Sequence, residues 1–321
     1  MPREKRARHS FILLEALASL SILSMIVAGM TTGAVAMMET GNYVADAAAA
    51  QDRADQIFSM LKMPADFCGY GLPRSVDLYR KIFAPAALAP PFSWDGVISV
   101  VDTQMKNGAV RKNGTCRIVY GIRSGYSIMD VVAVSGDILK IRISGIDDKL
   151  ESVPSRLRPD SLKNWALFGS GLPFARPLWL KSGAKDAYTG KYLNLVWNRS
   201  LSPETELRLH KNDELLYLGA IECNITLYDE KEEEGIFYIK DMRGGGRQPR
   251  ENGVMDARFV LDPDRRVLRV FLLIRGNRRY EDIKTKGTPP GWPPDYAREI
   301  PKQARHYRLF AFSESFELKN N

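Results

Sequence analysis

The hydrophobic pattern is strongest near the start of the chain, where residues 11–38 are apolar except for Glu15 and a few serines and threonines. A basic leader, residues 1–10, precedes this stretch. A run of about 18 or more apolar residues is typical of a membrane-spanning helix, whereas the apolar region of a secretory signal peptide is only about 7–15 residues long. The pattern therefore predicts a transmembrane helix over residues 11–38.

A helical pattern continues beyond the apolar stretch, with a narrower apolar face. Apolar residues recur at intervals of three and four, and charged residues such as Asp46 and Arg53 take other faces. Pro64 lacks the amide hydrogen that a continuing helix needs, so the helix is expected to end near Met63. We predict one stem helix over residues 11–63, with an apolar face made by Val44, Ala47, Ala48, Ala54, Ile57, Phe58 and Leu61.

Gly29 and Gly33 form a GxxxG pair inside the apolar half of this helix. Small residues at this spacing allow two membrane helices to approach closely. Glycine also weakens a helix by about 1 kcal/mol relative to alanine. The pair therefore indicates either a helix-packing surface or a point where the helix can loosen.

After Pro64 the period of the pattern changes from helical to extended. Short apolar runs separated by Gly or Ser-Gly predict antiparallel strands joined by hairpins, among them CRIVYGI and YSIMDVVAV at residues 116–134. Residues 144–210 are less regular and are interpreted as an insertion or long loops, and residues 288–295 contain four prolines and predict a loop. The expected fold is α+β, with a long N-terminal helix packed on an antiparallel β-sheet domain, residues 64–321.

Glu15 is the most informative single residue, because a charge inside a membrane costs about 2.5–3.5 kcal/mol on insertion scales and marks a functional site by default. Cleavage between Ser10 and Phe11 would create an α-amine four residues away, with a pKa of about 8. The amine of one subunit could then meet the Glu15 carboxylate of its neighbour. Basic residues in the leader keep the N-terminus cytoplasmic, so the domain is expected to be exported.

The segment RHSFILLEAL, residues 8–17, resembles the cleavage and assembly signal of type IV pilins and pseudopilins. Ser10 stands where glycine is usual, and Ile12 stands where threonine or serine is common. The resemblance implies cleavage by a prepilin peptidase between Ser10 and Phe11, N-methylation of Phe11, and assembly through Glu15. An uncleaved anchor with an interfacial Glu15 is the alternative.

Weaker likeness extends to PilW-type minor pilins, through ADFCGYGLP after the helix and through two C-terminal strands, RVLRVFLLIRGNRRY and HYRLFAFSESFELKN. This likeness implies a minor pilin that initiates a type IV pilus. Its partners would be other major or minor pilins and, before assembly, inner-membrane lipid. Its destination would be the pilus, the cell surface or the periplasm. A J-like pseudopilin of type II secretion and an uncleaved, membrane-anchored binding or adhesion domain remain alternatives.

Three cysteines lie in the part expected to be exported, where disulfides persist. They permit three single pairings. We favour Cys68 with Cys116, because both lie near turn glycines, whereas Cys223 lies in a strand-like run where a buried free thiol is expected.

The remaining composition points away from catalysis. The net charge of +8 includes +3 from the leader, and the basic residues of the domain are scattered among acids, so nucleic-acid binding is not predicted. The chain has three histidines and no complete nucleophile or phosphate-loop motif. We therefore expect no enzymatic activity, no metal site and no cofactor.

Overall fold

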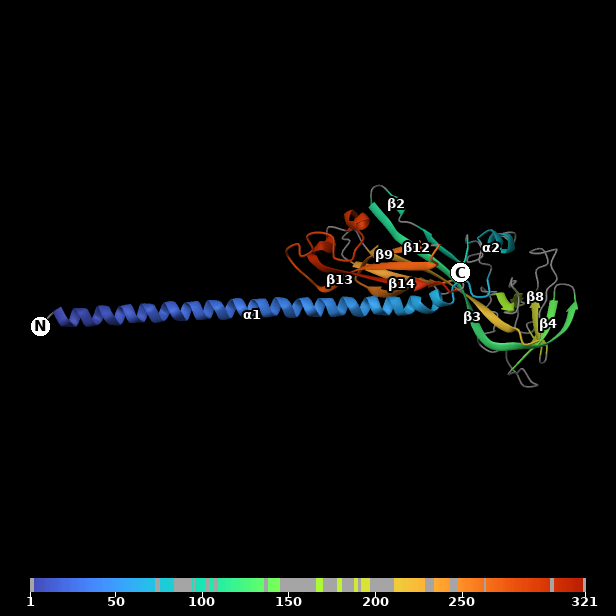
Figure 1. The fold of residues 1–321 in the computed structure, drawn as a ribbon, viewed down its shortest axis with the longest axis horizontal. Coiled ribbons are helices and arrows are strands. Elements are labelled where there is room, and N and C mark those ends of the chain that lie inside the picture. The colour runs from blue at the N-terminus through green and yellow to red at the C-terminus, as the bar shows by residue number, and fades with distance from the viewer. Residues whose placement is uncertain are drawn as a thin grey trace.

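The fold is α+β, with one long N-terminal helix running along and far beyond a β-sheet domain (Figure 1). The helix, α1, spans Arg3–Asp66, and the side chains of its first turns, up to residue 13, lie outside the described structure. The computed structural model describes residues 3–72, 76–83, 94, 96–101, 104–106, 109–135, 138–144, 166–169, 178–180, 188–189, 192–196, 211–228, 234–242, 247–262, 264–300 and 303–319.

The end of α1 corrects the predicted boundary at Met63. Pro64 lies inside the last turn, and the helix ends at Asp66. Proline removes only its own N–H bond, and the next free N–H groups find partners: Phe67 N–H donates to the Met63 carbonyl (3.1 Å) and Cys68 N–H to the Ala65 carbonyl (3.1 Å). One missing bond in the final turn is therefore insufficient to stop the helix at once.

The strands among the described residues form two antiparallel sheets. The smaller sheet has the order β12-β13-β14, and the larger has the order β1-β3-β4-β8-β6-β5-β9-β10-β11, with β2 beside β3 and β7 beside β8. The strand bounds are β1 Ile98–Val101, β2 Gln104–Lys106, β3 Ala109–Ser135, β4 Ile138–Ile143, β5 Ala166–Gly169, β6 Leu178–Leu180, β7 Tyr188–Thr189, β8 Tyr192–Val196, β9 Glu214–Tyr228, β10 Glu234–Asp241, β11 Arg247–Asn252, β12 Val254–Asp262, β13 Val267–Arg279 and β14 Tyr307–Glu317. The short helices are α2 Val76–Phe83, η3 Pro294–Glu299 and η4 Gln303–His306.

The strand β3 corrects a second expectation. The runs at residues 116–122 and 126–134 are predicted as two strands joined by a hairpin, yet they belong to one strand of 27 residues. Gly125 has a positive φ of 81°, and the pairing of β3 with β9 shifts between Arg123 and Ser127. The glycine therefore forms a bulge that bends the strand and does not reverse it.

This bent strand connects the part of the domain beside α1 with the part at the far end of the molecule. Its first half pairs with β1 and β9 beside α1, and its second half pairs with β4. The additional pairing of β3 with β9 closes β3, β4, β8, β6, β5 and β9 into a ring at the end of the molecule opposite the N-terminus (Figure 1). Residues 144–210, predicted to be irregular, contribute the short strands β5 to β8 within the part that is described; β5, β6 and β8 belong to the ring, and β7 pairs with β8.

The main core lies where α1 meets both sheets. Ile57 and Leu61 of the helix are completely buried and pack in one cluster with Ile118 of β3, Leu272 of β13 and other apolar side chains. A second cluster covers the other side of the small sheet, where Trp292, from the predicted proline-rich loop, packs with Met255, Leu273, Ile300, Ala304, Tyr307 and Leu309. The small sheet thus packs against apolar side chains on both faces.

Candidate functional site

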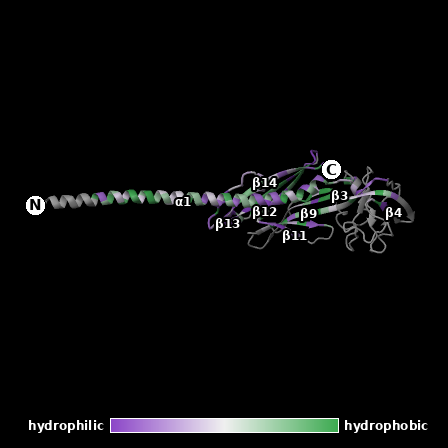
Figure 2. Ribbon diagram, turned by 90° about the horizontal axis from the view of Figure 1, so that it is seen from below, coloured by the Kyte–Doolittle hydropathy of each residue, from purple (hydrophilic) through white to green (hydrophobic). Residues whose placement is uncertain are grey.

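The outer half of α1, residues 14–38, projects from the domain (Figure 2), and its large apolar side chains are exposed. Twelve large apolar side chains in this half are each more than half exposed. The helix is long and apolar enough to cross a membrane, with a mean hydropathy of 1.8 in its most apolar window, none of which is buried in the domain. Such a surface requires an apolar environment outside this chain.

Hydroxyl side chains in the outer half are satisfied within the helix itself. Ser21 donates to the Leu17 carbonyl (2.9 Å), Thr31 to the Val27 carbonyl (2.8 Å), and Thr32 to the Ala28 carbonyl (2.8 Å). Ser24 and Thr40 bond backward in the same way. Because each of these five hydroxyls has a partner about one turn earlier, these five residues can enter an apolar medium without leaving that donor unpaired.

The predicted cleavage, assembly and helix-packing residues lie on the part of α1 that projects from the domain. Ser10 and Phe11 are in the helical backbone of α1, and their side chains lie outside the described structure. Glu15 is exposed on the outer half. A Cβ added at Gly29 or Gly33 would meet nothing within 4 Å, so in the isolated chain this face of the helix is open.

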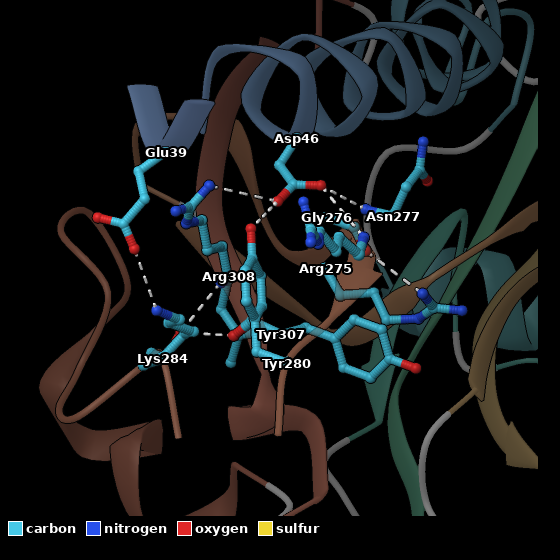
Figure 3. Close-up of polar contacts among 12 residues, drawn as sticks. Glu39, Asp46, Arg275, Gly276, Asn277, Tyr280, Lys284, Tyr307 and Arg308 are labelled. Carbon is cyan, nitrogen blue, oxygen red and sulfur yellow. Dashed lines mark hydrogen bonds and ion pairs between the residues drawn. The ribbon is translucent and has the colours of Figure 1, made fainter. Parts of the chain in front are cut away.

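The docked half of α1, residues 39–66, contacts the small sheet through apolar packing and through a buried carboxylate, Asp46, which is only 3% exposed. Its Oδ1 accepts hydrogen bonds from the backbone N–H groups of Asn277 (2.9 Å) and Arg278 (3.2 Å), and its Oδ2 accepts one from the Tyr280 hydroxyl (3.2 Å). The Arg308 guanidinium lies 3.7 Å from Oδ2 (Figure 3).

The backbone donors for Asp46 come from an irregularity in β13. Arg275 pairs with Leu309 of β14, but the next pair is Arg279 with Tyr307, so residues 276–278 bulge out of the ladder. A bulge leaves backbone N–H groups without their usual strand partners, and a buried N–H needs an acceptor. Asp46 supplies it. The contact is therefore a helix carboxylate inserted into a sheet defect.

Gly276 makes this insertion possible. A Cβ at this position would lie 2.6 Å from Cγ of Asp46 and 2.8 Å from its Oδ1, closer than real side chains approach. Two turns along the helix, Arg53 Nη1 donates to the Arg275 carbonyl (2.9 Å) and Nη2 donates to the Asn277 side chain. Burial and the nearby Arg275 charge lower the pKa of Arg53. The bulge is thus clamped to α1 from both sides.

A cluster of aromatic and basic side chains surrounds the point where α1 leaves the domain. The Arg308 guanidinium lies over the rings of Tyr43 (5.5 Å) and Tyr280 (4.9 Å), and Lys284 Nζ lies 4.9 Å from the Tyr280 ring. Lys284 also pairs with Glu39 at 3.6 Å. Burial, followed by the Asp46 charge, raises the pKa of Tyr280. Its hydroxyl donates its proton to Asp46 Oδ2.

The structure does not contain the predicted Cys68–Cys116 disulfide, because all three cysteines are free and buried. Cys116 lies directly opposite Cys223 on the adjoining strand β9, whereas Cys68 lies opposite Tyr120 and points its thiol at the Val97 carbonyl (3.8 Å). Burial raises the pKa of Cys68 to about 12 and also raises the pKa values of the other two thiols. The expectation of a buried free thiol at Cys223 agrees with this arrangement.

The sequence pattern misassigned Asp46 to a solvent-facing side and Val44 to the buried face. In the structure Val44 is exposed, and the buried stripe runs through Asp46, Ala50, Ala54 and Ile57. A signal existed in the sequence, because Asp46 precedes Ala50 by four residues and so shares its face. Nothing in the sequence marked the bulge at residues 276–278 as its partner.

No protein-family model matches the chain, and neither a curated protein nor a solved structure shows significant similarity to it. Within the described residues, no group of three or more His, Cys, Asp or Glu side chains is placed to hold a metal ion. The structure does contain an exposed apolar helix that continues into a helix docked on a folded domain. Such a helix can anchor the domain in a membrane or pack with similar helices.

Proposed function

We propose that the chain is a minor pilin: a structural subunit that is anchored in the inner membrane by α1 and then enters a type IV pilus, where it helps to initiate assembly. Cleavage by a prepilin peptidase between Ser10 and Phe11 precedes assembly. The role is structural and requires no catalysis. The domain is exported and reaches the pilus, the cell surface or the periplasm.

The observation that carries this proposal is the contrast within one helix. The outer half has an apolar surface that no part of the described domain covers, while the docked half is fixed to the domain by a buried carboxylate. A simple membrane anchor needs no rigid connection to its domain. A filament subunit does, because the position of its helix in the filament must determine the position of its domain.

Glu15 has a specific role in this proposal. After cleavage the Phe11 amine lies four residues from Glu15 and carries a positive charge at neutral pH. In an apolar filament core an unpaired amine is costly, and the Glu15 carboxylate of an adjoining subunit offsets that cost while setting the axial register of the two helices. Gly29 and Gly33, which are open in the isolated chain, allow close approach of a neighbouring helix.

The test is the N-terminus of the mature protein, measured by mass spectrometry after extraction from membranes. We expect the chain to begin at a methylated Phe11. Ser10→Gly, which restores the residue usual at this position, serves as the matched control and is expected to be cleaved at the same bond, at least as fast. An intact leader would indicate an uncleaved anchor and would overturn the proposal, as would a cut further along the chain.

A further inference from the structure

The loop between β13 and η3, residues 280–287, lies at the end of the domain that faces the outer half of α1 (Figure 1). Lys284 locates the loop relative to α1, because its Nζ lies 3.6 Å from the Glu39 carboxylate (Figure 3). Glu39 directly follows Met38, the last residue of the apolar stretch. The loop therefore sits level with the boundary between the apolar and polar parts of the helix.

The length of the apolar stretch places that boundary at a membrane surface. From Glu15 to Met38 the helix rises about 35 Å at 1.5 Å per residue, slightly more than the hydrocarbon thickness of about 30 Å. When the helix spans a bilayer, Glu39 lies among the lipid headgroups. Lys284, held beside Glu39, lies at the same depth.

The loop has the composition of an interfacial element. Ile283 is 47% exposed at its surface, although a large apolar side chain gains nothing from contact with water. The segment 278–287 carries four basic residues, Arg278, Arg279, Lys284 and Lys286, and two acidic ones, Glu281 and Asp282, for a net charge of +2. An exposed Tyr43 lies one helical turn beyond Glu39, and tyrosine is enriched at the level of the headgroups.

Residues of this loop surround an open hollow, which is lined by Glu281, Asp282, Ile283, Lys284, Lys286 and His306. Its walls carry both signs of charge around one apolar side chain. Lysine can extend its ammonium group toward phosphates while its stem remains in the apolar boundary layer. Ile283 and the two lysines together thus match the layered chemistry of a bilayer surface, with hydrocarbon next to phosphate.

We infer that loop 280–287 is a second membrane-contacting element: Ile283 enters the outer interface of the bilayer, and Lys284 and Lys286 face the phosphates of anionic lipids. This inference rests on the proposed anchoring of α1. Two contacts, one helix and one loop, hold the domain at a defined height and tilt above the membrane, whereas a lone helix could turn about its own axis in the bilayer and carry the attached domain with it.

The experiment uses the full chain in lipid nanodiscs, labelled with an environment-sensitive fluorophore at a single introduced cysteine. Ile283→Cys reports on the loop, and Met30→Cys reports on the helix. Val260→Cys is the matched control, since Val260 is a partly exposed apolar residue of β12, at 38%, located toward the opposite end of the small sheet. The three native thiols are buried and do not compete for the label while the chain is folded.

Nitroxide-labelled lipids then act as the quencher. We expect loss of fluorescence and a blue shift at residues 283 and 30 and neither change at residue 260. Replacing phosphatidylglycerol by phosphatidylcholine should weaken quenching at residue 283 and leave residue 30 unchanged. Quenching at 30 without quenching at 283 overturns the inference and leaves the helix anchor intact, and quenching at 283 that ignores lipid charge overturns the role of the lysines. Absence of quenching at 30 overturns the anchor itself.

Discussion

The two halves of α1 use the same secondary structure in opposite ways. In the outer half, residues 14–38, apolar side chains face outward and the hydroxyls bond back onto the helix. In the docked half, residues 39–66, apolar side chains face the core, and a buried Asp46 bonds outward to another element. The apolar surface of the outer half needs covering by surroundings that this chain does not supply, whereas the apolar surface of the docked half is covered by the chain itself.

This difference shows that carboxylates on the two halves of one helix have different structural roles. Glu15 is exposed, and the partner proposed for it belongs to another subunit. Asp46 has partners in the same chain, on the bulge of β13, at Tyr280 directly after β13, and on β14. Changing each carboxylate separately therefore distinguishes assembly from folding.

The largest expected effect is the loss of assembly in Glu15→Ala. Removing one partner of a buried charge pair costs about 3–5 kcal/mol, which corresponds to more than about a hundredfold in association. The variant should still be exported, cleaved and as stable as the unmodified chain, because Glu15 contacts nothing in the domain. Under the proposed pilin role, counts of surface filaments and co-purification with pilins measure the effect. Glu15→Gln should also fail, and normal filaments with both variants would show that Glu15 is incidental.

The next effect is on folding. Asp46→Ala leaves the N–H groups of Asn277 and Arg278, the Tyr280 hydroxyl and the Arg308 charge without their buried acceptor. We expect a loss of about 3–5 kcal/mol in the free energy of unfolding, measured by denaturant titration of the full chain in detergent. Asp46→Asn keeps one acceptor oxygen and should lose less.

Asp52→Ala is the matched control for Asp46→Ala, because Asp52 is an exposed carboxylate on the same half of the helix. Its effect should stay within about 0.5 kcal/mol. Equal losses at both positions would mean that the docked half tolerates Asp46 removal, and the proposed rigid connection would fail.

A smaller effect is expected where the bulge meets the helix. Gly276→Ala places a Cβ 2.6 Å from Asp46, and such overpacking typically costs about 1–3 kcal/mol. Gly41→Ala is the control, because Gly41 lies in α1 with nothing within 4 Å of an added Cβ. That change should be neutral or stabilise the helix by up to about 1 kcal/mol. Thermal unfolding followed by circular dichroism separates the two outcomes.

The smallest effect near neutral pH concerns the thiols. Burial raises the pKa of Cys68 from 9.0 to about 12, so its neutral form contributes stability that is present below pH 9 and is lost as pH rises toward 12. The helix has no titratable group between Glu15 and Glu39, so this loss of stability at high pH must arise elsewhere in the chain. Each buried thiol adds a slope of about 1.4 kcal/mol per pH unit in that range. Cys68→Ala should reduce the slope, and an unchanged slope would contradict the assignment.

Patterns with a local cause could be predicted from the sequence. The apolar stretch at residues 11–38 and the strand runs follow from side-chain periodicity, and the α+β arrangement is confirmed. Predictions failed where a distant partner decided the outcome. Gly125 signals a turn in isolation, yet pairing with β9 keeps β3 continuous. Cys116 has no visible relation to Cys223 until register places the two opposite each other.

The sequence by itself determined that the chain begins with a long helix whose outer half is apolar, and that one charge, Glu15, interrupts it. These features depend on neighbours within a few residues, which is the range over which periodicity and hydropathy act. Only the tertiary structure decided how that helix is attached. Asp46 and Asn277 of the bulge are 231 residues apart in the chain, and an aspartate is expected to face solvent until the fold brings unpaired backbone donors to its carboxylate.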